Sequence, residues 1–254
     1  MPRCSAVLIA LNEQSRIEDA VSSVRPFVDE VLVLDGGSTD STRVLAAAAG
    51  AKVLEHPFDG FISQKQRATG LAQYDLVFAL DADERVDEEL GHALQAACAA
   101  AGDAGLAAWQ VRRRNFLDGR ALRASGWYPD ARLRLFDRRQ ARWSGAEPHD
   151  VVEASGAVGQ LPGHLLHDPQ RSTEEFRQGS LLHAQRRANS LARSSRALYP
   201  WTPWLHALGH YLRKVLLAHA WRDGRRGWTI AWVGALGVFA KYSLAAELRR
   251  EVPE

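Results

Sequence analysis

Short apolar runs and amphipathic stretches alternate over the first hundred residues of the chain. The apolar runs predict strands at residues 5–10, 31–34, 52–54 and 76–80, and the stretches between them predict helices at about residues 15–24, 41–50, 63–73 and 86–101. Ser15 and Glu18 have the spacing of a capping box, and Gly50 ends the second helix. This alternation predicts an α/β fold with a mostly parallel sheet and helices on both faces.

The pattern changes beyond residue 107. Residues 107–113 and 120–124 flank Asp118-Gly119, a hairpin turn signal, and residues 132–136 alternate polar and apolar positions with period two. We expect these strands to extend the sheet and to form the side of the protein on which an acceptor molecule would bind.

The last third of the chain has a helical pattern. Ser172 and Glu175 form a second capping box, and helices are expected near residues 173–197, 203–221 and 228–248, with breaks at Pro200 and at Asp223-Gly224. The sequence therefore predicts two domains, a catalytic α/β domain at residues 1–170 and a helical extension at residues 171–254.

Charge and tryptophan are distributed unevenly. Residues 1–170 hold 18 Lys and Arg against 24 Asp and Glu, whereas residues 171–254 hold 14 against 6 and also contain five of the eight Trp. Residues 228–240 carry no charge, but a spanning helix needs about twenty apolar residues. We expect the extension to lie on an anionic membrane surface, with packing as a buried helix pair as the alternative. No nucleic-acid-binding module accompanies the basic residues, so we expect no nucleic acid partner.

The cysteines and the N-terminal residues favour a cytoplasmic enzyme. Cys4 and Cys98 match no metal-ligand spacing and are expected to be free thiols in a reducing cytosol. The apolar run at residues 6–11 is shorter than the core of a signal peptide. We expect the protein on the inner face of the cytoplasmic membrane.

Candidate chemistry begins with Asp81 and Asp83, a D-x-D sequence directly after the apolar run at residues 76–80. Two carboxylates one residue apart at the end of a buried strand can share a hard divalent cation, which prefers oxygen ligands and keeps positions open for phosphate oxygens. A solvated turn is the alternative reading of this tripeptide. The D-x-D sequence thus indicates a metal–diphosphate site.

Two further polar segments also follow predicted strands. Asn12 and Glu13 come after the first strand, and residues 35–40, Asp35-Gly36-Gly37-Ser38-Thr39-Asp40, come after the second. The glycines allow close approach of the backbone to a ligand, and Asp40 can cap the next helix. Because ligands of open parallel sheets bind outside the carboxyl ends of strands, we expect all three segments to meet in one site.

Together these three motifs resemble the donor-site motifs of family 2 glycosyltransferases, which are inverting enzymes of the GT-A fold, a Rossmann-like architecture with a mostly parallel mixed sheet. Residues 61–66, 80–85 and 148–150 are similar to those of the lipopolysaccharide inner-core β-glucosyltransferases that act on heptose. Segments of the helical extension, such as residues 211–214 and 240–242, also look like that subgroup.

The resemblance implies a role for each polar residue of the donor site. Asp83 would bind Mg²⁺ or Mn²⁺, Asp81 would reach the donor ribose or a metal-bound water, and Asp35 would accept a hydrogen bond from the uracil ring. The remaining residues expected near the donor are Asn12, Glu13, Gly37, Ser38 and Lys65. Lys65 would place a positive charge near the diphosphate, with a solvated lysine as the alternative.

An inverting transfer also needs a base, and Asp150 is the leading candidate because the resembling subgroup carries a His-acid pair at this position. Glu147 and Glu84 compete for this role. Trp127, Glu84 and His149 are expected on the acceptor side, where an aromatic ring could stack on a sugar. Gln140-Ala141-Arg142-Trp143 is one residue short of the Q-x-x-R-W motif of processive members, so we expect transfer of a single sugar.

The sequence therefore predicts an inverting transferase that moves one hexose, glucose by resemblance, from a UDP-sugar to a lipopolysaccharide core or related glycolipid. A catalytically silent nucleotide-sugar-binding or membrane scaffold protein is one alternative, and a sugar-phosphate nucleotidyltransferase is another. The first strand is followed by Leu11-Asn12-Glu13 in place of the Gly-rich loop of a nucleotidyltransferase, and no G-x-G-x-x-G suits a dinucleotide-binding oxidoreductase.

Overall fold

The computed structural model describes residues 3–101, 105–146, 149–168, 172–194 and 197–251. It divides the chain into two compact units, the first formed by Met1–Arg114 and Asp130–His167 and the second by Asn115–Pro129 and Asp168–Glu254. The structure therefore groups residues 115–129 with the C-terminal helices. The predicted boundary at residue 170 places them in the first domain instead.

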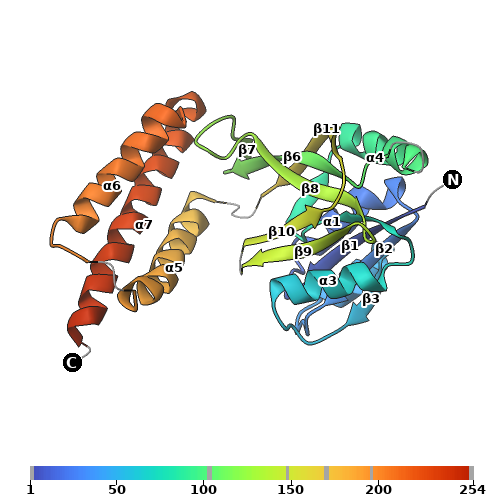
Figure 1. Ribbon diagram of the computed structural model, residues 1–254, viewed down its shortest axis with the longest axis horizontal. Coiled ribbons are helices and arrows are strands. Elements are labelled where there is room, and N and C mark those ends of the chain that lie inside the picture. Colours follow the sequence, from blue (N-terminus) through green and yellow to red (C-terminus); the bar gives the residue numbers. More distant parts are fainter. Residues whose placement is uncertain (1–2, 102–104, 147–148, 169–171, 195–196, 252–254) are drawn as a thin grey trace. The chain divides into compact units, whose positions relative to one another are not determined.

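The first unit is built on a mixed sheet with the strand order β3-β2-β1-β4-β8-β6-β11-β5 (Figure 1). The strands are β1 (Cys4–Ala10), β2 (Glu30–Asp35), β3 (Lys52–Glu55), β4 (Leu76–Ala79), β5 (Glu84–Val86), β6 (Ala108–Leu117), β8 (Asp130–Asp137) and β11 (Val158–His167). Strands β1 to β4 pair in parallel, whereas β8 is antiparallel to both β4 and β6, and β5 is antiparallel to β11.

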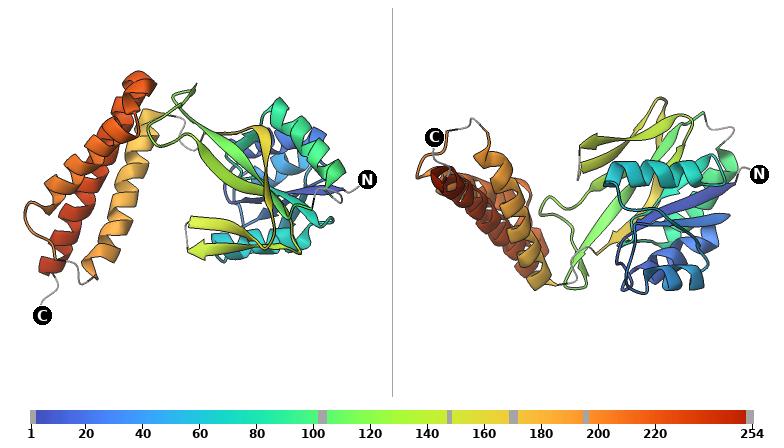
Figure 2. Two further views of the ribbon diagram at one scale, coloured as in Figure 1. Left: turned by 45° about the horizontal axis from the view of Figure 1, so that its top comes forward. Right: turned by 90° about the horizontal axis from the view of Figure 1, so that it is seen from below.

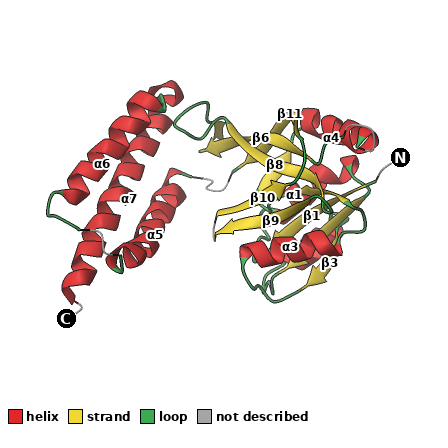
Figure 3. Ribbon diagram, in the orientation of Figure 1, coloured by secondary structure: helices red, strands yellow, loops and turns green. Residues whose placement is uncertain are grey.

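Alternate residues of the central strands face two separate cores, as the period of a strand requires. Ala6 and Leu8 of β1 belong to the core that includes α1 (Ile17–Val24), α2 (Thr42–Ala48) and α4 (Glu88–Ala100). Val7 belongs to the other core, which includes α3 (Phe61–Leu71) and β9 (Ala141–Ala146). Strand β9 pairs with β10 (His149–Ala154) in a small sheet of two strands (Figure 3). Helices thus cover both faces, which confirms the predicted α/β class.

The structure differs from the predicted elements at two helix starts. The fourth helix begins at Glu88, because Asp87 caps it by accepting a hydrogen bond from Leu90 N, and residues 84–86 form the strand β5. Helix α1 begins at Ile17, with Arg16 at the N-cap and no capping hydrogen bond from its side chain, so the box predicted from Ser15 does not open this helix. Strands β9, β10 and β11 lie in a region where the residue pattern predicts no strand.

The second unit contains α5 (Thr173–Ala192), α6 (Thr202–Leu212) and α7 (Gly224–Glu251), which lie side by side in both views of Figure 2. Ser172 caps α5 as predicted, since its hydroxyl accepts a hydrogen bond from Glu175 N. A π-helical turn at Arg213–Leu217 and a 3₁₀ turn at Ala220–Asp223 join α6 to α7. The rings of Trp204 and Phe239 pack edge to face, with centroids 4.7 Å apart.

Residues 115–129 pack within this second unit. Leu117 and Leu122 are buried with Phe176 of α5 and with Ile230 and Val233 of α7. The segment includes the short strand β7 (Arg120–Ala121), which pairs with the end of β6.

The carboxylate of Asp223 holds the same segment by hydrogen bonds. It accepts from Arg123 N at 2.7 Å, from Ala124 N at 3.1 Å and from Ser125 Oγ at 2.6 Å. Lys214 Nζ donates to Ser125 O at 2.7 Å. Both apolar burial and charged hydrogen bonds therefore attach this segment to the helices.

The second unit also carries an apolar surface, which we call the α6–α7 face. It consists of exposed side chains from α6, from the turns and from α7: Trp201, Trp204, Leu205, Leu208, Leu212, Leu216, Leu217, Trp221, Trp228, Trp232 and Leu236. Within the described residues, the helical stretch Ala220–Arg250 has the length and composition to cross a membrane, a test that core helices of soluble proteins also pass.

Candidate functional site

Two loops at the carboxyl ends of β1 and β2 are tied together by hydrogen bonds. Parallel pairing places Ala10 opposite Asp35, so the loops that follow lie side by side. Asn12 Oδ1 accepts from Thr39 N at 2.9 Å, and Asn12 N donates to Ser38 Oγ at 2.9 Å. The predicted convergence of the first two motifs is therefore present, and Asn12 and Ser38 are the residues that connect them.

Asp35 organises the second loop. Its carboxylate is fully buried and accepts hydrogen bonds from Gly37 N at 3.0 Å and from Ser38 N at 2.8 Å. Gly37 has φ of +101°, a conformation that a side chain would strain. These contacts give Asp35 and Gly37 a role in shaping the turn, and the contact of Asp35 with a uracil ring stays a prediction.

A cavity of about 400 Å³ lies where the carboxyl ends of the strands meet. Its lining brings together five of the predicted site residues, Glu13, Lys65, Asp81, Asp83 and Asp150. The other lining residues are Ile9, Ala10, Leu11, Phe58, Phe61, Gln64, Ala82 and His167. Asn12, Asp35, Gly37 and Ser38 are not among the lining residues; Asp35 and Ser38 are buried, whereas Asn12 and Gly37 are exposed. We call this space the donor cavity.

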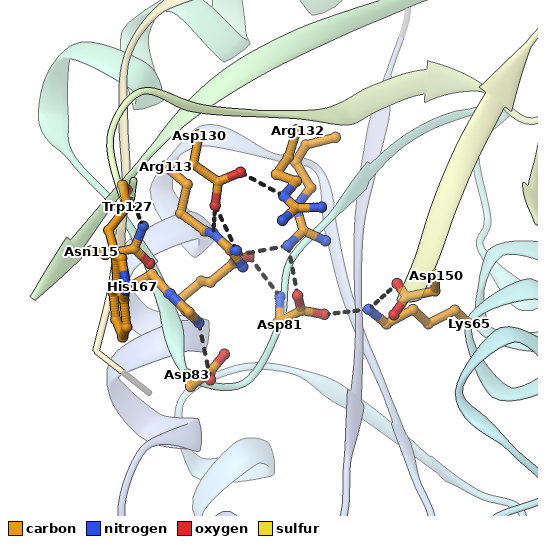
Figure 4. A network of polar contacts seen from close by, with 12 residues as sticks. Lys65, Asp81, Asp83, Arg113, Asn115, Trp127, Asp130, Arg132, Asp150 and His167 are labelled. Atoms are coloured by element: carbon orange, nitrogen blue, oxygen red, sulfur yellow. Dashed lines mark hydrogen bonds and ion pairs between the residues drawn. The ribbon is translucent and has the colours of Figure 1, made fainter. Parts of the chain in front are cut away.

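Lys65 joins the D-x-D motif to the candidate base (Figure 4). Its Nζ lies 2.7 Å from Asp81 Oδ1 and 2.8 Å from Asp150 Oδ2, and it also lies over the ring of Trp143, 4.9 Å from the centroid. Burial lowers the pKa of Lys65, but the attraction of Asp81 and Asp150 outweighs this effect, and the pKa is raised above its ordinary value. Lys65 is therefore a fixed cation in the site and not a solvated one.

Helix α3 and strand β9 explain how Lys65 and Asp150 meet. Trp143 N donates to Gln66 Oε1 at 3.0 Å, and Trp143 Nε1 donates to Thr69 Oγ1 at 3.0 Å. These bonds attach β9 to α3, and β10, which carries Asp150, pairs with β9.

The two acids of the D-x-D motif have different surroundings. Both oxygens of Asp81 are bound, Oδ1 by Lys65 and Oδ2 by Arg134 at 2.6 Å. Burial raises the pKa of Asp81, yet Arg134 and Lys65 hold it well below its usual range. Asp83 Oδ2 lies 3.4 Å from His167 Nε2, and Asp83 Oδ1 has no hydrogen-bond partner among the described residues. Asp83 is thus the acid with an oxygen available to a ligand.

His167 is a site residue that sequence reasoning missed. It ends β11, and the antiparallel register places it opposite Glu84, one residue from Asp83. Burial raises the pKa of Asp83, but the hydrogen bond from His167 and its charge lower it below the ordinary value. No sequence motif surrounds this histidine, so its place in the site follows from strand pairing alone.

Glu84 is completely buried, which corrects its expected place on the acceptor side and as a competing base. Its Oε1 lies 2.7 Å from Arg134 and 3.4 Å from Arg113, so the carboxylate faces two guanidinium groups and not an open cavity. We assign Glu84 a positioning role, since it holds Arg134 against Asp81.

A second cavity, of about 430 Å³, shares Asp81 and Asp150 with the donor cavity. Three arginines of the sheet extension also line it, Arg113, Arg132 and Arg134. The remaining lining residues are Gln110, Ala131, Leu133, Trp143, Val151 and Val152. We call this space the second cavity. Its arginines were not predicted as site residues, although Arg132 and Arg134 stand on one face of β8 by their period-two spacing.

The remaining predicted residues are placed as follows. Asp150 lines both cavities, and its Oδ1 has no hydrogen-bond partner in the described part of the chain. Trp127 belongs to the second unit, where its ring packs edge to face on Phe176 at 5.6 Å. Glu147 and the side chain of His149 lie outside the described residues.

The ligand atoms near Asp83 suit a divalent cation that takes most of its other ligands from a substrate and from water. The described residues contain no group of three or more His, Cys, Asp or Glu side chains that could hold a metal ion. Asp83 and His167 offer one carboxylate and one imidazole, and a hard cation with few protein ligands commonly binds phosphate oxygens and water at its other positions. The residues therefore fit the cation, and the pair Asp83 and His167 would hold it.

Three comparisons with known proteins relate the chain to glycosyltransferases. The model of the family described as glycosyl transferase family 2 matches residues 5–155. The lipopolysaccharide core biosynthesis glycosyltransferase LpsC of Rhizobium meliloti (strain 1021) is 30% identical over 248 residues, which cover 92% of this chain and 88% of LpsC. A glycosyltransferase described as uncharacterized from Rickettsia bellii (strain RML369-C) is 42% identical over 88 residues, which are 35% of this chain and 30% of that protein.

Among solved structures, the chain is similar to glucosyl-3-phosphoglycerate synthase from Mycobacterium tuberculosis in complex with Mn²⁺, UDP and glucosyl-3-phosphoglycerate. The TM-score is 0.36 and the sequence identity 28%, over 45% of this chain and 44% of that one. The chain thus spans less than half of the length of this solved relative.

Proposed function

The chain belongs to glycosyl transferase family 2, and on that premise we propose that it is an inverting, metal-dependent hexosyltransferase that moves one glucose from UDP-glucose to a lipopolysaccharide core or related glycolipid acceptor. One observation carries this proposal above the others. Lys65 connects Asp81 of the D-x-D motif to Asp150, so the residues proposed for donor binding and for proton transfer line one cavity.

We assign the diphosphate end of the donor to the floor of the donor cavity. A divalent cation held by Asp83 and His167 would act as a Lewis acid on the diphosphate leaving group. Lys65 adds a fixed positive charge, and Asp81 positions it. Glu13 also lines this part of the cavity, where burial raises its pKa, Arg16 opposes the rise and Asp83 adds to it. We assign Glu13 to donor binding.

The nucleoside end of the donor would bind near Phe58 and Phe61. Their rings pack edge to face with centroids 5.1 Å apart, line the donor cavity and stay partly exposed. An exposed aromatic pair offers a flat apolar surface to a planar base. The two loops that carry Asn12, Asp35, Gly37 and Ser38, which hydrogen bonds tie together, would support this binding.

Asp150 would act as the base. The acceptor hydroxyl oxygen forms a bond to the anomeric carbon, the bond from that carbon to the diphosphate oxygen breaks, and the nucleoside diphosphate leaves with the electron pair. The hydroxyl proton passes to Asp150 Oδ1, the oxygen that Lys65 does not hold. Lys65 fixes the other oxygen and so orients the carboxylate.

The acceptor class and the membrane partner rest on the relative and on the second unit. LpsC is described as a lipopolysaccharide core enzyme and matches nearly the whole chain. The α6–α7 face exposes tryptophan and leucine, and exposed Arg213, Arg222 and Arg225 stand at its turn. Apolar side chains bordered by arginine suit an anionic bilayer, so we propose that the enzyme works peripherally on the inner face of the cytoplasmic membrane.

A donor panel tests the proposed function. The full chain is incubated with Mg²⁺ or Mn²⁺, with several nucleotide sugars and with heptose-containing core oligosaccharide, and the products are read by mass spectrometry. The proposal expects one added hexose from UDP-glucose. A protein that turns over no nucleotide sugar would be a silent binding protein, and synthesis of a nucleotide sugar from a sugar phosphate would indicate a nucleotidyltransferase.

A further inference from the structure

Eight charged side chains form one chain of alternating sign across the site (Figure 4). In order they are Asp150, Lys65, Asp81, Arg134, Glu84, Arg113, Asp130 and Arg132, and the distances between charged atoms of neighbours range from 2.6 to 3.4 Å. We call this set the charge chain. It begins at the donor cavity and runs along the second cavity.

The two ends of the charge chain differ from its interior. Each of the six interior groups has two neighbours of opposite sign, so their charges compensate one another. Asp150 and Arg132 have one such neighbour each within the described residues. The negative charge of Asp150 and the positive charge of Arg132 are therefore the least compensated charges of the charge chain.

Both ends line the second cavity. The side chain of Arg132 is 43% exposed, more than any other member of the charge chain, and that of Asp150 is 17% exposed. Arg132 uses Nε for Asp130, at 2.9 Å, which leaves its two terminal amino groups for another partner. A guanidinium presented in this way is suited to bind the oxygens of a phosphate or carboxylate in a bidentate manner.

Resting on the proposed function, we infer that the second cavity binds an acceptor that carries an anionic group, with Arg132 on the anion and Asp150 on the hydroxyl that attacks. Trp143 and Leu133 are apolar residues of the same lining. Arg134 also lines the cavity, but Asp81 and Glu84 already hold its guanidinium, so Arg132 is the cation left for a ligand. The charge chain thus specifies an anionic glycoside in preference to a neutral one.

A pair of matched acceptors tests this inference with the full chain and UDP-glucose. The probes are a methyl heptoside and the same heptoside with one phosphate, and a methyl uronide serves as a third arm that separates a carboxylate from a phosphate. Wild-type protein should show a kcat/KM for the phosphorylated heptoside about 10-fold or more above that for the neutral one, as expected for a hydrogen-bonded charge pair. The change should lie mainly in KM.

The variant Arg132→Gln should bring this ratio close to one. Arg132→Lys keeps the charge and the approach to Asp130 but loses the planar guanidinium, so the ratio of the two kcat/KM values should fall only in part. This second variant keeps the inference testable if Arg132→Gln folds poorly. Arg142→Gln is the matched control, because Arg142 is exposed on β9 and pairs with Glu153 at 3.6 Å outside the charge chain. It should leave the ratio at the wild-type value.

Three outcomes would overturn the inference. These are equal kcat/KM for neutral and anionic acceptors in the wild type, a ratio unchanged by Arg132→Gln, and an equal effect of Arg142→Gln. Transfer of glucose to each of the three acceptors is measured by mass spectrometry. Absence of transfer to all of them would refute the proposed function, whereas transfer without preference for the anionic acceptors would refute this inference alone.

Discussion

Lys65 Nζ lies 2.8 Å from Asp150 Oδ2, although 85 positions separate the two residues in the chain. The same nitrogen lies 2.7 Å from Asp81. A change in the charge of one carboxylate therefore alters the electrostatic surroundings of the other through the shared cation. One side chain thus links the proposed donor and acceptor sides of the site.

The proposed base is tested by Asp150→Asn. The amide keeps the size of the side chain but cannot take the hydroxyl proton, so turnover should fall by about 10²-fold or more while donor affinity changes little. Steady-state kinetics and calorimetric titration with UDP-glucose measure the two effects. Loss of donor affinity in proportion to turnover would instead mark Asp150 as a donor ligand.

The cation site is tested by Asp83→Ala and His167→Ala. Both variants should lose Mn²⁺-dependent binding of UDP, which is measured by titration with and without the metal, and Asp83→Ala should abolish transfer because its carboxylate is the charged ligand. Asp59→Ala serves as a control, since Asp59 pairs with Arg67 at 2.9 Å and does not line the donor cavity. Full activity of Asp83→Ala would disprove the assignment.

Lys65→Gln should destabilise the fold as well as reduce activity. The substitution leaves Asp81 with Arg134 alone and removes the ion-pair partner of Asp150, and loss of one member of a largely buried ion pair costs about 3–5 kcal/mol. Urea unfolding measures the loss. The double variant Lys65→Gln with Asp150→Asn should lose less than the sum of the single losses, and strict additivity would contradict direct coupling.

Asp130 should contribute an acid-sensitive part of the stability. Burial raises its pKa, but Arg113 outweighs burial and lowers the pKa below the unfolded value. The stabilisation is therefore present above about pH 4 and is lost as the pH falls through the folded pKa. The difference in free energy of unfolding between the wild type and Asp130→Asn should shrink from about pH 6 to pH 3. A constant difference would argue against this ion pair.

Membrane binding is tested by placing acids on the α6–α7 face. Leu217 is 75% exposed, and the double variant Leu216→Asp and Leu217→Asp should lower binding to vesicles with anionic lipid by about 10-fold or more, since each buried leucine contributes about 1.5–3 kcal/mol. High salt should weaken binding of the wild type through the arginines. Val44→Asp, an exposed site in α2 of the first unit, is the control in vesicle flotation. An equal loss of vesicle binding in this variant would show that the α6–α7 face is not the membrane-binding surface.

The parts of the fold that follow from local pattern were predictable. Alternation of apolar runs and helices placed Asp35 and Asp81 at strand ends, and Ser172 marked the start of α5. These signals act within a few residues of one another. The D-x-D motif similarly lies at a cavity, as the position of two acids at the carboxyl end of a strand predicts.

Residues that meet through antiparallel pairing were not predictable in the same way. His167 reaches Asp83 because β11 pairs with β5, and Arg113 reaches Asp130 because β6 pairs with β8. Register between distant strands is decided by tertiary packing, which no single motif records. For the same reason Glu84 was expected on the acceptor side, although its carboxylate is buried against two arginines.

The packing of residues 115–129 delays the burial of this segment until the C-terminal helices have been synthesised. Leu117 and Leu122 pack with Ile230 and Val233, which leave the ribosome roughly 110 residues later, or about 5–20 s at usual elongation rates. During that interval Leu117 and Leu122 have no partner from the later part of the chain to cover them. We therefore expect the nascent chain to bind a chaperone at this stage. A stop codon in the last third of the gene would leave the same leucines uncovered for good, so such an allele should behave as a loss of the whole protein and not as an enzyme freed from its helices.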